Sequence, residues 1–196
     1  LRAVEFYSGI GGMHYALKSC TAEVNIIAAI DINTTANQVY TFNFPGTTLL
    51  NRNIEGIKVD EFIKFKADIF TMSPPCQPFT RQGNQKASDD PRTKSFLYVM
   101  KIIRSVPKPP AYILMENVKG FEVSETRDEF IKTLRETNYC FQELLLSPAQ
   151  FGIPNSRLRY FLIAARNPRQ LPFSNNESIM NSLPATLNVN SKPCSS

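Results

Sequence analysis

Cys76 is the residue of this chain that is best placed to act as a nucleophile. It lies in the run Ser-Pro-Pro-Cys-Gln-Pro-Phe at positions 73–79, directly after an apolar run at positions 67–72 that is typical of a buried strand. Two consecutive prolines hold their own φ at about −65° and push the residue before each of them toward extended backbone, so the thiol has little conformational freedom. A thiol held in this way suits covalent catalysis, although a free cysteine is also often a small buried hydrophobe.

Glu116 and a pair of arginines could act beside this thiol. Glu116 ends a predicted strand at positions 112–115, so its carboxyl should lie at the same sheet edge as Cys76 if both follow parallel strands. A carboxylic acid there can protonate a ring nitrogen of an electron-poor heterocycle while the sulfur adds to a neighbouring carbon. Arg157 and Arg159 precede the last predicted strand, and in extended backbone they point to one side, where they could hold a base carbonyl or a phosphate. A solvated basic turn is the alternative for this pair.

A glycine-rich turn and an aspartate indicate a ligand site in the amino-terminal half. The turn Tyr-Ser-Gly-Ile-Gly-Gly at positions 7–12 follows the first predicted strand and opens a helix, where small residues let the backbone approach a ligand. The dinucleotide fingerprint Gly-x-Gly-x-x-Gly is not met. Asp31 ends the second predicted strand, where a carboxylate can accept both hydroxyls of a ribose. Together these features predict an adenosine-containing ligand without a pyrophosphate, and the alternatives are a tight connection and a solvated carboxylate.

Apolar strand patterns alternate with helical patterns along most of the chain. Strands are predicted at positions 3–7, 24–30, 49–54, 69–72, 112–115, 141–146 and 160–165, and helices at 13–20, 34–40, 59–65, 95–103 and 127–135. Asn33 or Thr34 is the expected cap of the second helix. The last two strands are joined by a loop too short for a crossover helix, so we expect them to be antiparallel. The predicted fold class is α/β, a doubly wound, mostly parallel seven-stranded Rossmann-like sheet with ligands outside the carboxyl ends of its parallel strands.

Composition is typical of a soluble intracellular protein. The 196 residues suffice for one core, and 22 Lys and Arg against 17 Asp and Glu give a net charge of +5, which suits an anionic partner or an ordinary basic enzyme. Four widely separated cysteines without a Cys-x-x-Cys pair argue against zinc and against a secreted disulfide framework. No stretch approaches the ~18 apolar residues that span a bilayer, and the amino end shows no signal pattern. We therefore expect a reducing compartment, no metal and no membrane partner.

Four motifs stand in the order found in cytosine-5 methyltransferases. They read Tyr-Ser-Gly-Ile-Gly-Gly from position 7, Ser-Pro-Pro-Cys-Gln-Pro-Phe-Thr from 73, Glu-Asn-Val-Lys-Gly-Phe-Glu from 116 and Gly-Ile-Pro-Asn-Ser-Arg-Leu-Arg-Tyr-Phe from 152. The chain resembles this family over about residues 3–165, and most resembles the branch once called type-2 DNA methyltransferases, which methylates transfer RNA. The resemblance implies a methyltransferase domain at residues 1–166 and a linker or tail at 167–196, with the family's target-recognition region missing.

The resemblance assigns a role to each candidate residue. In the implied reaction Cys76 attacks C6 of a cytosine, Glu116 binds and protonates N3, and C5 takes the methyl group of S-adenosylmethionine, with S-adenosylhomocysteine as product. Arg157 and Arg159 match the family's Arg-x-Arg element, which helps to hold the base. The residues implied to bind the cofactor are Tyr7, Ile10, Gly11, Gly12, Asp31, Ile32, Asn53, Ile54, Ser73 and Ser95.

The implied cofactor contacts run from one end of the ligand to the other. Gly11 and Gly12, together with Ile10, are implied to cradle the amino-acid part. Asp31 is implied to bind the ribose, and Ile32 to cover the adenine.

The implied substrate is a cytosine in the anticodon loop of aspartate transfer RNA, bound by a monomer in the cytoplasm or also in the nucleus. A loop base leaves its stack at lower cost than a base in a duplex, and the polar segment 83–90 fits either a part that closes over it or a plain surface loop. Without the target-recognition region we expect weak cofactor binding and unselective methylation. The alternatives are a DNA cytosine-5 methyltransferase, a truncated non-catalytic module that binds cofactor or RNA, and a cysteine hydrolase, whose histidine base could only be His14.

Overall fold

A seven-stranded sheet forms the middle layer of the computed structural model, which describes residues 1–75, 91–169, 171 and 178–183. The strands are β1 Arg2–Phe6, β2 Asn25–Asp31, β3 Leu49–Asn51, β4 Ile69–Met72, β5 Tyr112–Val118, β6 Tyr139–Leu146 and β7 Arg159–Arg166. The helices are α1 Gly12–Ser19, α2 Thr34–Asn43, α3 Val59–Phe65, α4 Pro91–Ser105 and α5 Glu125–Glu136, with short 3-10 turns η1 Ile54–Gly56, η3 Phe121–Val123 and η4 Pro148–Phe151. Within the described ranges, no helix is long and apolar enough to cross a bilayer.

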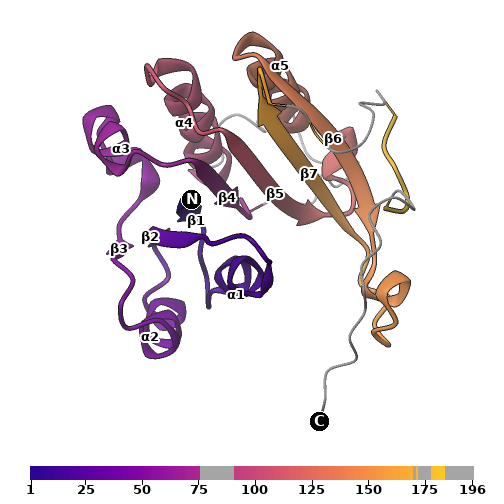
Figure 1. Ribbon diagram of the computed structural model, residues 1–196, viewed down its shortest axis with the longest axis horizontal. Coiled ribbons are helices and arrows are strands. Elements are labelled where there is room, and N and C mark those ends of the chain that lie inside the picture. The colour runs from indigo at the N-terminus through magenta and orange to yellow at the C-terminus, as the bar shows by residue number, and fades with distance from the viewer. Residues whose placement is uncertain (76–90, 170, 172–177, 184–196) are drawn as a thin grey trace.

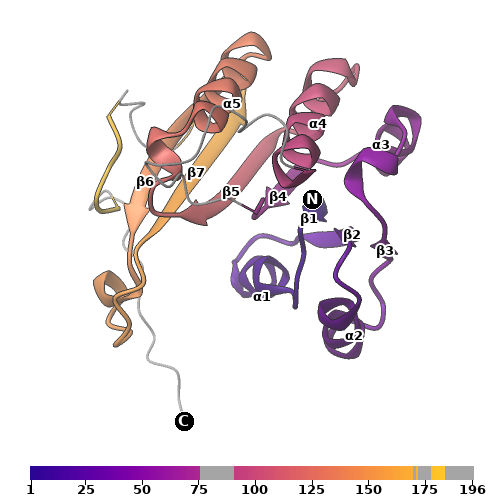
Figure 2. The same ribbon diagram turned by 180° about the vertical axis from the view of Figure 1, so that it is seen from behind.

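Helices cover both faces of the sheet, as the doubly wound prediction requires. Figures 1 and 2 show α1 and α2 on one face and α3, α4 and α5 on the other. The larger core lies under the second group, where apolar strand residues meet aromatic helix residues. Its members include Phe6, Met72, Met115, Phe96 and Phe130, each at most 2% exposed. Burial of this set accounts for much of the hydrophobic stabilisation, at ~25 cal/mol per Å² of apolar surface.

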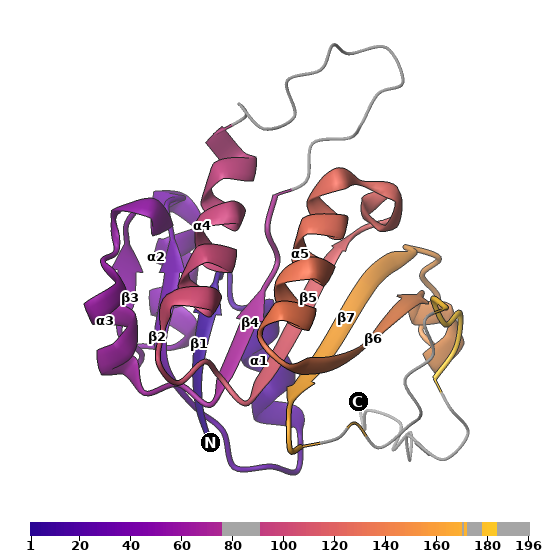
Figure 3. The ribbon, with the colours of Figure 1, turned by 90° about the horizontal axis from the view of Figure 1, so that it is seen from above.

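The strand order is β3-β2-β1-β4-β5-β7-β6, and it places the ligand edge. The neighbours from β3 to β5 run parallel, whereas β7 is antiparallel to both β5 and β6. The predicted mostly parallel sheet with an antiparallel last strand is therefore confirmed. Figure 3 shows the carboxyl ends of the parallel strands at one edge. The chain order reverses between β1 and β4, and ligands of such sheets bind at this point, outside the strand ends.

The predicted elements differ from the observed ones mainly at their ends. The first predicted strand is shifted by one residue, because β1 runs from Arg2 to Phe6 and Tyr7 already turns with φ +54°. The strand predicted at 49–54 is also too long, because β3 ends at Asn51 and the side chain of Asn53 caps η1. The strand predicted at 112–115 is too short, since β5 continues to Val118 and places Glu116 inside the strand rather than after it.

Two helix starts follow from side-chain caps. The Asn33 side chain accepts a hydrogen bond from the backbone N–H of Ala36 at 3.0 Å, which confirms Asn33 as the cap of α2. The Ser124 hydroxyl oxygen accepts the N–H of Arg127 at 3.1 Å and begins α5 in the same way. Each cap satisfies one of the N–H groups that a helix start leaves without a partner.

Part of the predicted tail pairs with the edge of the sheet. Met180 forms a parallel bridge with Leu144 of β6. Its N–H donates to the Glu143 carbonyl at 3.0 Å, and its carbonyl accepts the N–H of Leu145 at 2.8 Å. The described residues 178–183 therefore lie beside β6 and cover an otherwise open strand edge.

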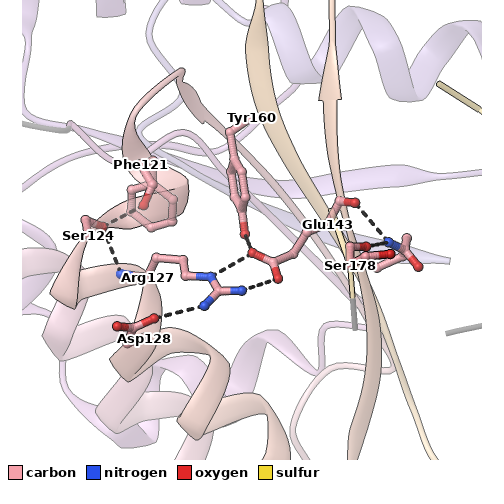
Figure 4. Close-up of polar contacts among 8 residues, drawn as sticks. Phe121, Ser124, Arg127, Asp128, Glu143, Tyr160 and Ser178 are labelled. Carbon is pink, nitrogen blue, oxygen red and sulfur yellow. Dashed lines mark hydrogen bonds and ion pairs between the residues drawn. The ribbon is translucent and has the colours of Figure 1, made fainter. Parts of the chain in front are cut away.

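A buried ion pair fastens α5 to the two antiparallel strands (Figure 4). Glu143 of β6 is 3% exposed, and its carboxylate accepts Nε of Arg127 at 2.8 Å as well as a short bond from Nη2. The Tyr160 hydroxyl of β7 donates to the same carboxylate at 2.7 Å. Asp128 also contacts the guanidinium, but its side chain is 71% exposed. One buried carboxylate thus joins α5, β6 and β7.

We expect Arg127→Ala to lower the free energy of unfolding by about 3 kcal/mol, because it leaves the Glu143 carboxylate buried without its cation. Asp128→Ala is the matched control: it removes only the exposed partner and should change stability by no more than about 0.5 kcal/mol. Urea unfolding of both variants measures the difference. Equal losses would contradict the assignment of the stabilisation to the buried half of the network.

Candidate active site

A cavity of about 200 Å³ opens at the carboxyl edge of the parallel strands. Its lining residues are Tyr7, Asp31, Ile32, Arg52, Asn53, Ile54, Pro75 and Ser95. Six of these eight residues are among the ten that the sequence predicts for cofactor binding, and the exceptions are Arg52 and Pro75. Of the other four predicted residues, Ile10, Gly11 and Gly12 belong to the glycine turn and Ser73 follows β4, and none of them lines the cavity.

Asp31 sits at the end of β2 with both carboxylate oxygens in use. Its Oδ2 accepts the N–H of Gly9 at 2.8 Å, and its Oδ1 accepts the N–H of Asn33 at 2.8 Å. A carboxylate oxygen can accept more than one hydrogen bond, so each oxygen can still receive a ligand hydroxyl. Asp31 therefore ties the glycine turn to the start of α2 and presents acceptor sites to the cavity.

An exposed isoleucine supplies an apolar wall. Ile32 lines the cavity and is 68% exposed, although it lies between the polar residues Asp31 and Asn33. Ile10 of the glycine turn is also 61% exposed. A planar apolar ligand would remove such surface from water, which is favourable at ~25 cal/mol per Å².

Tyr7 is held in a strained turn at the other side of the cavity. Its φ of +54° is costly for a residue with a bulky side chain. Its hydroxyl lies 3.0 Å from Ser95 Oγ of α4, and its carbonyl accepts the Ser73 hydroxyl at 3.2 Å. Ser73 thus acts on the backbone of the Tyr7 turn, while Tyr7 and Ser95 form part of the cavity wall.

The glycine turn is shaped by α2. Gly11 has φ +94°, and a Cβ at this position would lie 2.3 Å from the Phe44 ring and 3.2 Å from the Tyr40 ring. Its N–H donates to the Ser8 carbonyl at 2.9 Å, and its carbonyl accepts the N–H of Tyr15 at 3.0 Å in α1. Only glycine fits this position, which explains why the turn carries a glycine directly before the helix.

Arg52 is a cavity residue that sequence reasoning missed. Its guanidinium donates to Glu61 of α3 at 2.8 Å and to the Gly56 carbonyl at 2.6 Å. These bonds hold the turn that presents Asn53 and Ile54 to the cavity. An arginine after a short strand carries no sequence signal for this role, because its partners become neighbours only in the fold.

Glu116 and Arg159 form an ion pair near this edge. They lie on one face of the antiparallel pair β5 and β7, since Glu116 is opposite Phe161 and Arg159 is two residues from Phe161. Arg159 Nε is 3.2 Å from Glu116 Oε1, and the two side chains are 18% and 28% exposed. Arg157 is exposed, and its N–H donates to Asn155 Oδ1 at 2.8 Å.

Burial raises the pKa of Glu116 above that of an ordinary carboxyl, while Arg159 and, more weakly, Arg157 act to lower it. Burial is the larger effect, so the proton stays on Glu116 to a higher pH than on a solvated glutamate. The pair predicted from sequence therefore acts on Glu116, directly through Arg159 and by charge through Arg157. An acid in this state can donate a hydrogen bond or a proton to a bound heterocycle.

Asn117 anchors the segment that leads to the predicted nucleophile. It is 4% exposed and points to the face opposite Glu116, where its Nδ2 donates to the Pro74 carbonyl at 3.1 Å. Pro74 lies two residues before Cys76, and Cys76 itself is outside the described residues, as is the segment 83–90. Sequence reasoning missed this role of Asn117, although an amide next to an acid in one strand must point to the opposite face.

A second cavity, of about 360 Å³, lies at the opposite edge of the sheet, between the ends of α3 and α4. None of the candidate residues lines it. Within the described residues, no three His, Cys, Asp or Glu side chains are grouped so that they could hold a metal ion. The groups that could bind a ligand or act as an acid thus lie at the carboxyl edge of the sheet. They are the Asp31 carboxylate, the exposed Ile32 side chain and the Glu116 carboxyl, whose pKa is raised.

Known proteins resemble this chain in sequence and in fold. A family model described as C-5 cytosine-specific DNA methylase matches residues 1–192. The tRNA (cytosine(38)-C(5))-methyltransferase of Bos taurus is 52% identical over 95% of this chain and 48% of its own length. The DNA (cytosine-5)-methyltransferase of Dictyostelium discoideum is 50% identical over 85% of this chain and 45% of its own length. The crystal structure of a Spodoptera frugiperda DNMT2 mutant superposes with a TM-score of 0.83 at 51% identity, covering 93% of this chain and 55% of that one. The chain thus spans about half the length of the curated relatives it matches.

We expect Arg159→Gln to raise the pKa of Glu116 further, because it removes the larger of the two cationic effects that oppose burial. Arg157→Gln should raise it by less and serves as the matched control. A ¹³C NMR titration of the glutamate carboxyl carbons measures both shifts. An unchanged Glu116 pKa in Arg159→Gln would contradict the ion pair as an electrostatic influence.

Proposed function

Because the chain belongs to the C-5 cytosine-specific DNA methylase family, we propose that it transfers a methyl group from S-adenosylmethionine to C5 of cytosine 38 in transfer RNA. The observation that carries this proposal is the Glu116 acid beside Arg159, next to the anchored segment that leads to Cys76. The choice of substrate is supported by relatives that are named for this transfer RNA position.

The cavity residues fit this cofactor. Asp31 offers carboxylate acceptors to the ribose hydroxyls, and exposed Ile32 offers an apolar surface to the adenine. Asn53 and Ile54, at the start of the η1 turn, line the same cavity. When bound, S-adenosylmethionine supplies an electrophilic methyl group. The Tyr7 ring, held at the cavity wall, is suited to attract the positive sulfonium.

In the proposed reaction the chain's own groups activate the base. The Cys76 thiolate adds to C6 of the cytosine while Glu116 gives its proton to N3, which moves electron density to C5. After C5 is methylated, the C5 proton passes to solvent, Cys76 leaves C6 as a thiolate and N3 returns its proton to Glu116, which restores the aromatic ring. Arg159, and Arg157 beside it, would hold the base and its carbonyl oxygen. The raised pKa of Glu116 supports the acid role, since the proton must be present before transfer.

We further propose that the substrate cytosine lies in the anticodon loop of aspartate transfer RNA. A loop base is already partly unstacked, so its insertion beside Cys76 costs less than flipping a base from a duplex. DNA is the second candidate, favoured by the relative named DNA (cytosine-5)-methyltransferase. Methyl transfer to an aspartate transfer RNA transcript and to a DNA duplex of the same loop sequence, measured side by side, decides between them.

Cys76→Ala should abolish methyl transfer and leave cofactor binding nearly unchanged, because the thiol forms the bond to the base and not to the cofactor. A transfer RNA containing 5-fluorocytosine should trap a covalent complex with the unmodified chain, since fluorine at C5 cannot leave as a proton does. The assay uses the longest natural form that contains this chain, with gel-shift detection under denaturing conditions. Methyl transfer by Cys76→Ala would refute the covalent mechanism.

Asp31→Ala should weaken S-adenosylmethionine binding by about 1 to 3 kcal/mol, the usual scale for a lost charge-assisted hydrogen bond. Asp68→Ala is the matched control, because the Asp68 carboxylate also accepts a backbone N–H, that of Arg2 at 3.0 Å, but at the opposite edge of the sheet. Isothermal titration calorimetry compares the two. Equal losses in both variants would show a general effect on folding rather than a ribose contact.

A further inference from the structure

Tyr7 bonds to residues on both sides of the connection that contains Cys76. This connection runs from the end of β4 to the start of α4, and Cys76 lies in it outside the described residues. The Tyr7 carbonyl accepts the Ser73 hydroxyl at 3.2 Å, three residues before Cys76. The Tyr7 hydroxyl lies 3.0 Å from Ser95 Oγ in α4, on the other side of the connection. One residue at the cofactor cavity therefore contacts both flanks of the segment that carries the proposed nucleophile.

The contact with Ser73 follows from the strand register. The parallel strands β1 and β4 end opposite each other, so Tyr7 and Ser73 leave the sheet side by side. The next residue, Pro74, is held from the β5 side, where Asn117 Nδ2 donates to its carbonyl at 3.1 Å. The backbone just before Cys76 is thus fixed from both neighbouring strands, by the Tyr7 carbonyl on one side and by the Asn117 amide on the other.

The Tyr7 turn is strained and needs its contacts to persist. Its φ of +54° is costly for a bulky residue, and such a conformation is kept only where the surroundings fix it. The ring packs against the larger core, and the N–H of the following Ser8 donates to the Ile30 carbonyl at 3.2 Å. The contact of the hydroxyl with Ser95, which is 8% exposed, ties the far end of the side chain to α4.

The hydroxyl contact can be separated from the ring. A phenylalanine at position 7 fills the same space in the core and at the cavity wall, but it makes no hydrogen bond to Ser95. The strained turn then loses the contact that comes from α4 and relaxes toward ordinary backbone. This relaxation moves the carbonyl that holds Ser73, and with it the backbone that leads to Cys76.

We propose that Tyr7 is a positioning residue for Cys76: its hydroxyl, held by Ser95, fixes the turn whose carbonyl holds Ser73 and the backbone before the thiol. The role of Cys76 as the nucleophile rests on the proposed function. A nucleophile attacks productively only from about 3 to 3.5 Å, so a small displacement of its backbone slows bond formation. The hydroxyl should therefore affect the reaction of the thiol and leave the affinity for the cofactor unchanged.

The first experiment tests the bond between the two hydroxyl groups by urea unfolding of Tyr7→Phe, Ser95→Ala and the double variant. Ser95→Ala should lower the free energy of unfolding by less in the Tyr7→Phe background than in the unmodified chain, because its partner is already gone. Equal losses in the two backgrounds would show that the hydroxyl groups do not stabilise each other, and the proposal would be wrong.

The second experiment measures the rate at which a transfer RNA containing 5-fluorocytosine forms the covalent complex, at saturating S-adenosylmethionine and in the longest natural form of the chain. Tyr7→Phe should slow this step about tenfold, within the ~100-fold that a displacement of ~1 Å can cost. The affinity for S-adenosylhomocysteine, measured by calorimetry, should stay within about twofold, because the ring remains at the cavity wall.

Tyr139→Phe is the matched control. The Tyr139 hydroxyl is also buried and also donates to one acceptor, the Pro110 carbonyl at 2.5 Å, but it lies at the opposite edge of the sheet. The control should lose stability without a change in the rate of the covalent step. An equal fall in rate in Tyr139→Phe would show a general effect of a lost buried hydroxyl and would overturn the positioning role.

Ser73→Ala cuts the proposed path at its other end. It should slow the covalent step by itself, and adding Tyr7→Phe to it should slow the step by much less than tenfold, because both changes act through one contact. A full tenfold fall in the Ser73→Ala background would overturn the path through the Tyr7 carbonyl.

The remaining outcomes separate this proposal from the proposed function. A loss of S-adenosylhomocysteine affinity in Tyr7→Phe that matches the loss of rate would make the hydroxyl a cofactor contact and overturn the positioning role, while the function stands. An unchanged rate in Tyr7→Phe would do the same. If the unmodified chain forms no covalent complex, the proposed mechanism is wrong and the positioning role falls with it.

Discussion

Side-chain alternation along β5 is the constraint on which the candidate site depends. Glu116 and Asn117 are consecutive in this strand, so one points to the face with Arg159 and the other to the face where it holds the Pro74 carbonyl. A slip of the β5 register by one residue would turn each of these two side chains to the other face and break both contacts. The register is fixed because β5 pairs with β4 on one side and with β7 on the other, where Glu116 stands opposite Phe161. The pairing of β5 with β4 and β7 thus fixes the direction of the Glu116 side chain and lets Asn117 hold the segment at Pro74.

The register of β1 and β2 places Glu5 and Asp31 on one face of the sheet, where the two carboxyl groups differ in burial. Glu5 stands opposite Ala29, so Asp31, two residues further along β2, lies on the face of Glu5. Asp31 is at the strand end, half exposed, and accepts two backbone N–H groups. Glu5 is deeper, and burial raises its pKa to about 7. Two carboxyl groups one pleat apart therefore lie in different environments, one at the open strand end and one inside the core.

Apolar strand patterns predict the number of strands and their order along the chain, and the short loop between the last two strands predicts that this pair is antiparallel. The rule that ligands lie just after strand ends points to Asp31, and the family resemblance adds the other five predicted cavity residues. What sequence reasoning misses depends on contacts between distant segments. Asn117 reaches Pro74, and Arg52 reaches Glu61, only after the chain has folded. Gly11 was expected at the ligand, and it proves to be required first by the close Phe44 ring.

The balance at Glu116 depends on how Arg159 is shared. A bidentate arginine would hold a carboxylate firmly in its charged form, since such pairs are among the strongest charge-assisted contacts. Here Arg159 approaches Glu116 through Nε at 3.2 Å, while its Nη1 donates to the Leu158 carbonyl at 2.9 Å. The guanidinium is therefore divided between two acceptors, and partly exposed ion pairs of this kind contribute only about 0 to 1 kcal/mol. Burial then outweighs the arginine and raises the pKa of Glu116. A carboxyl group close to a cation can thus keep its proton to a higher pH than a solvated glutamate does, which favours its use as an acid.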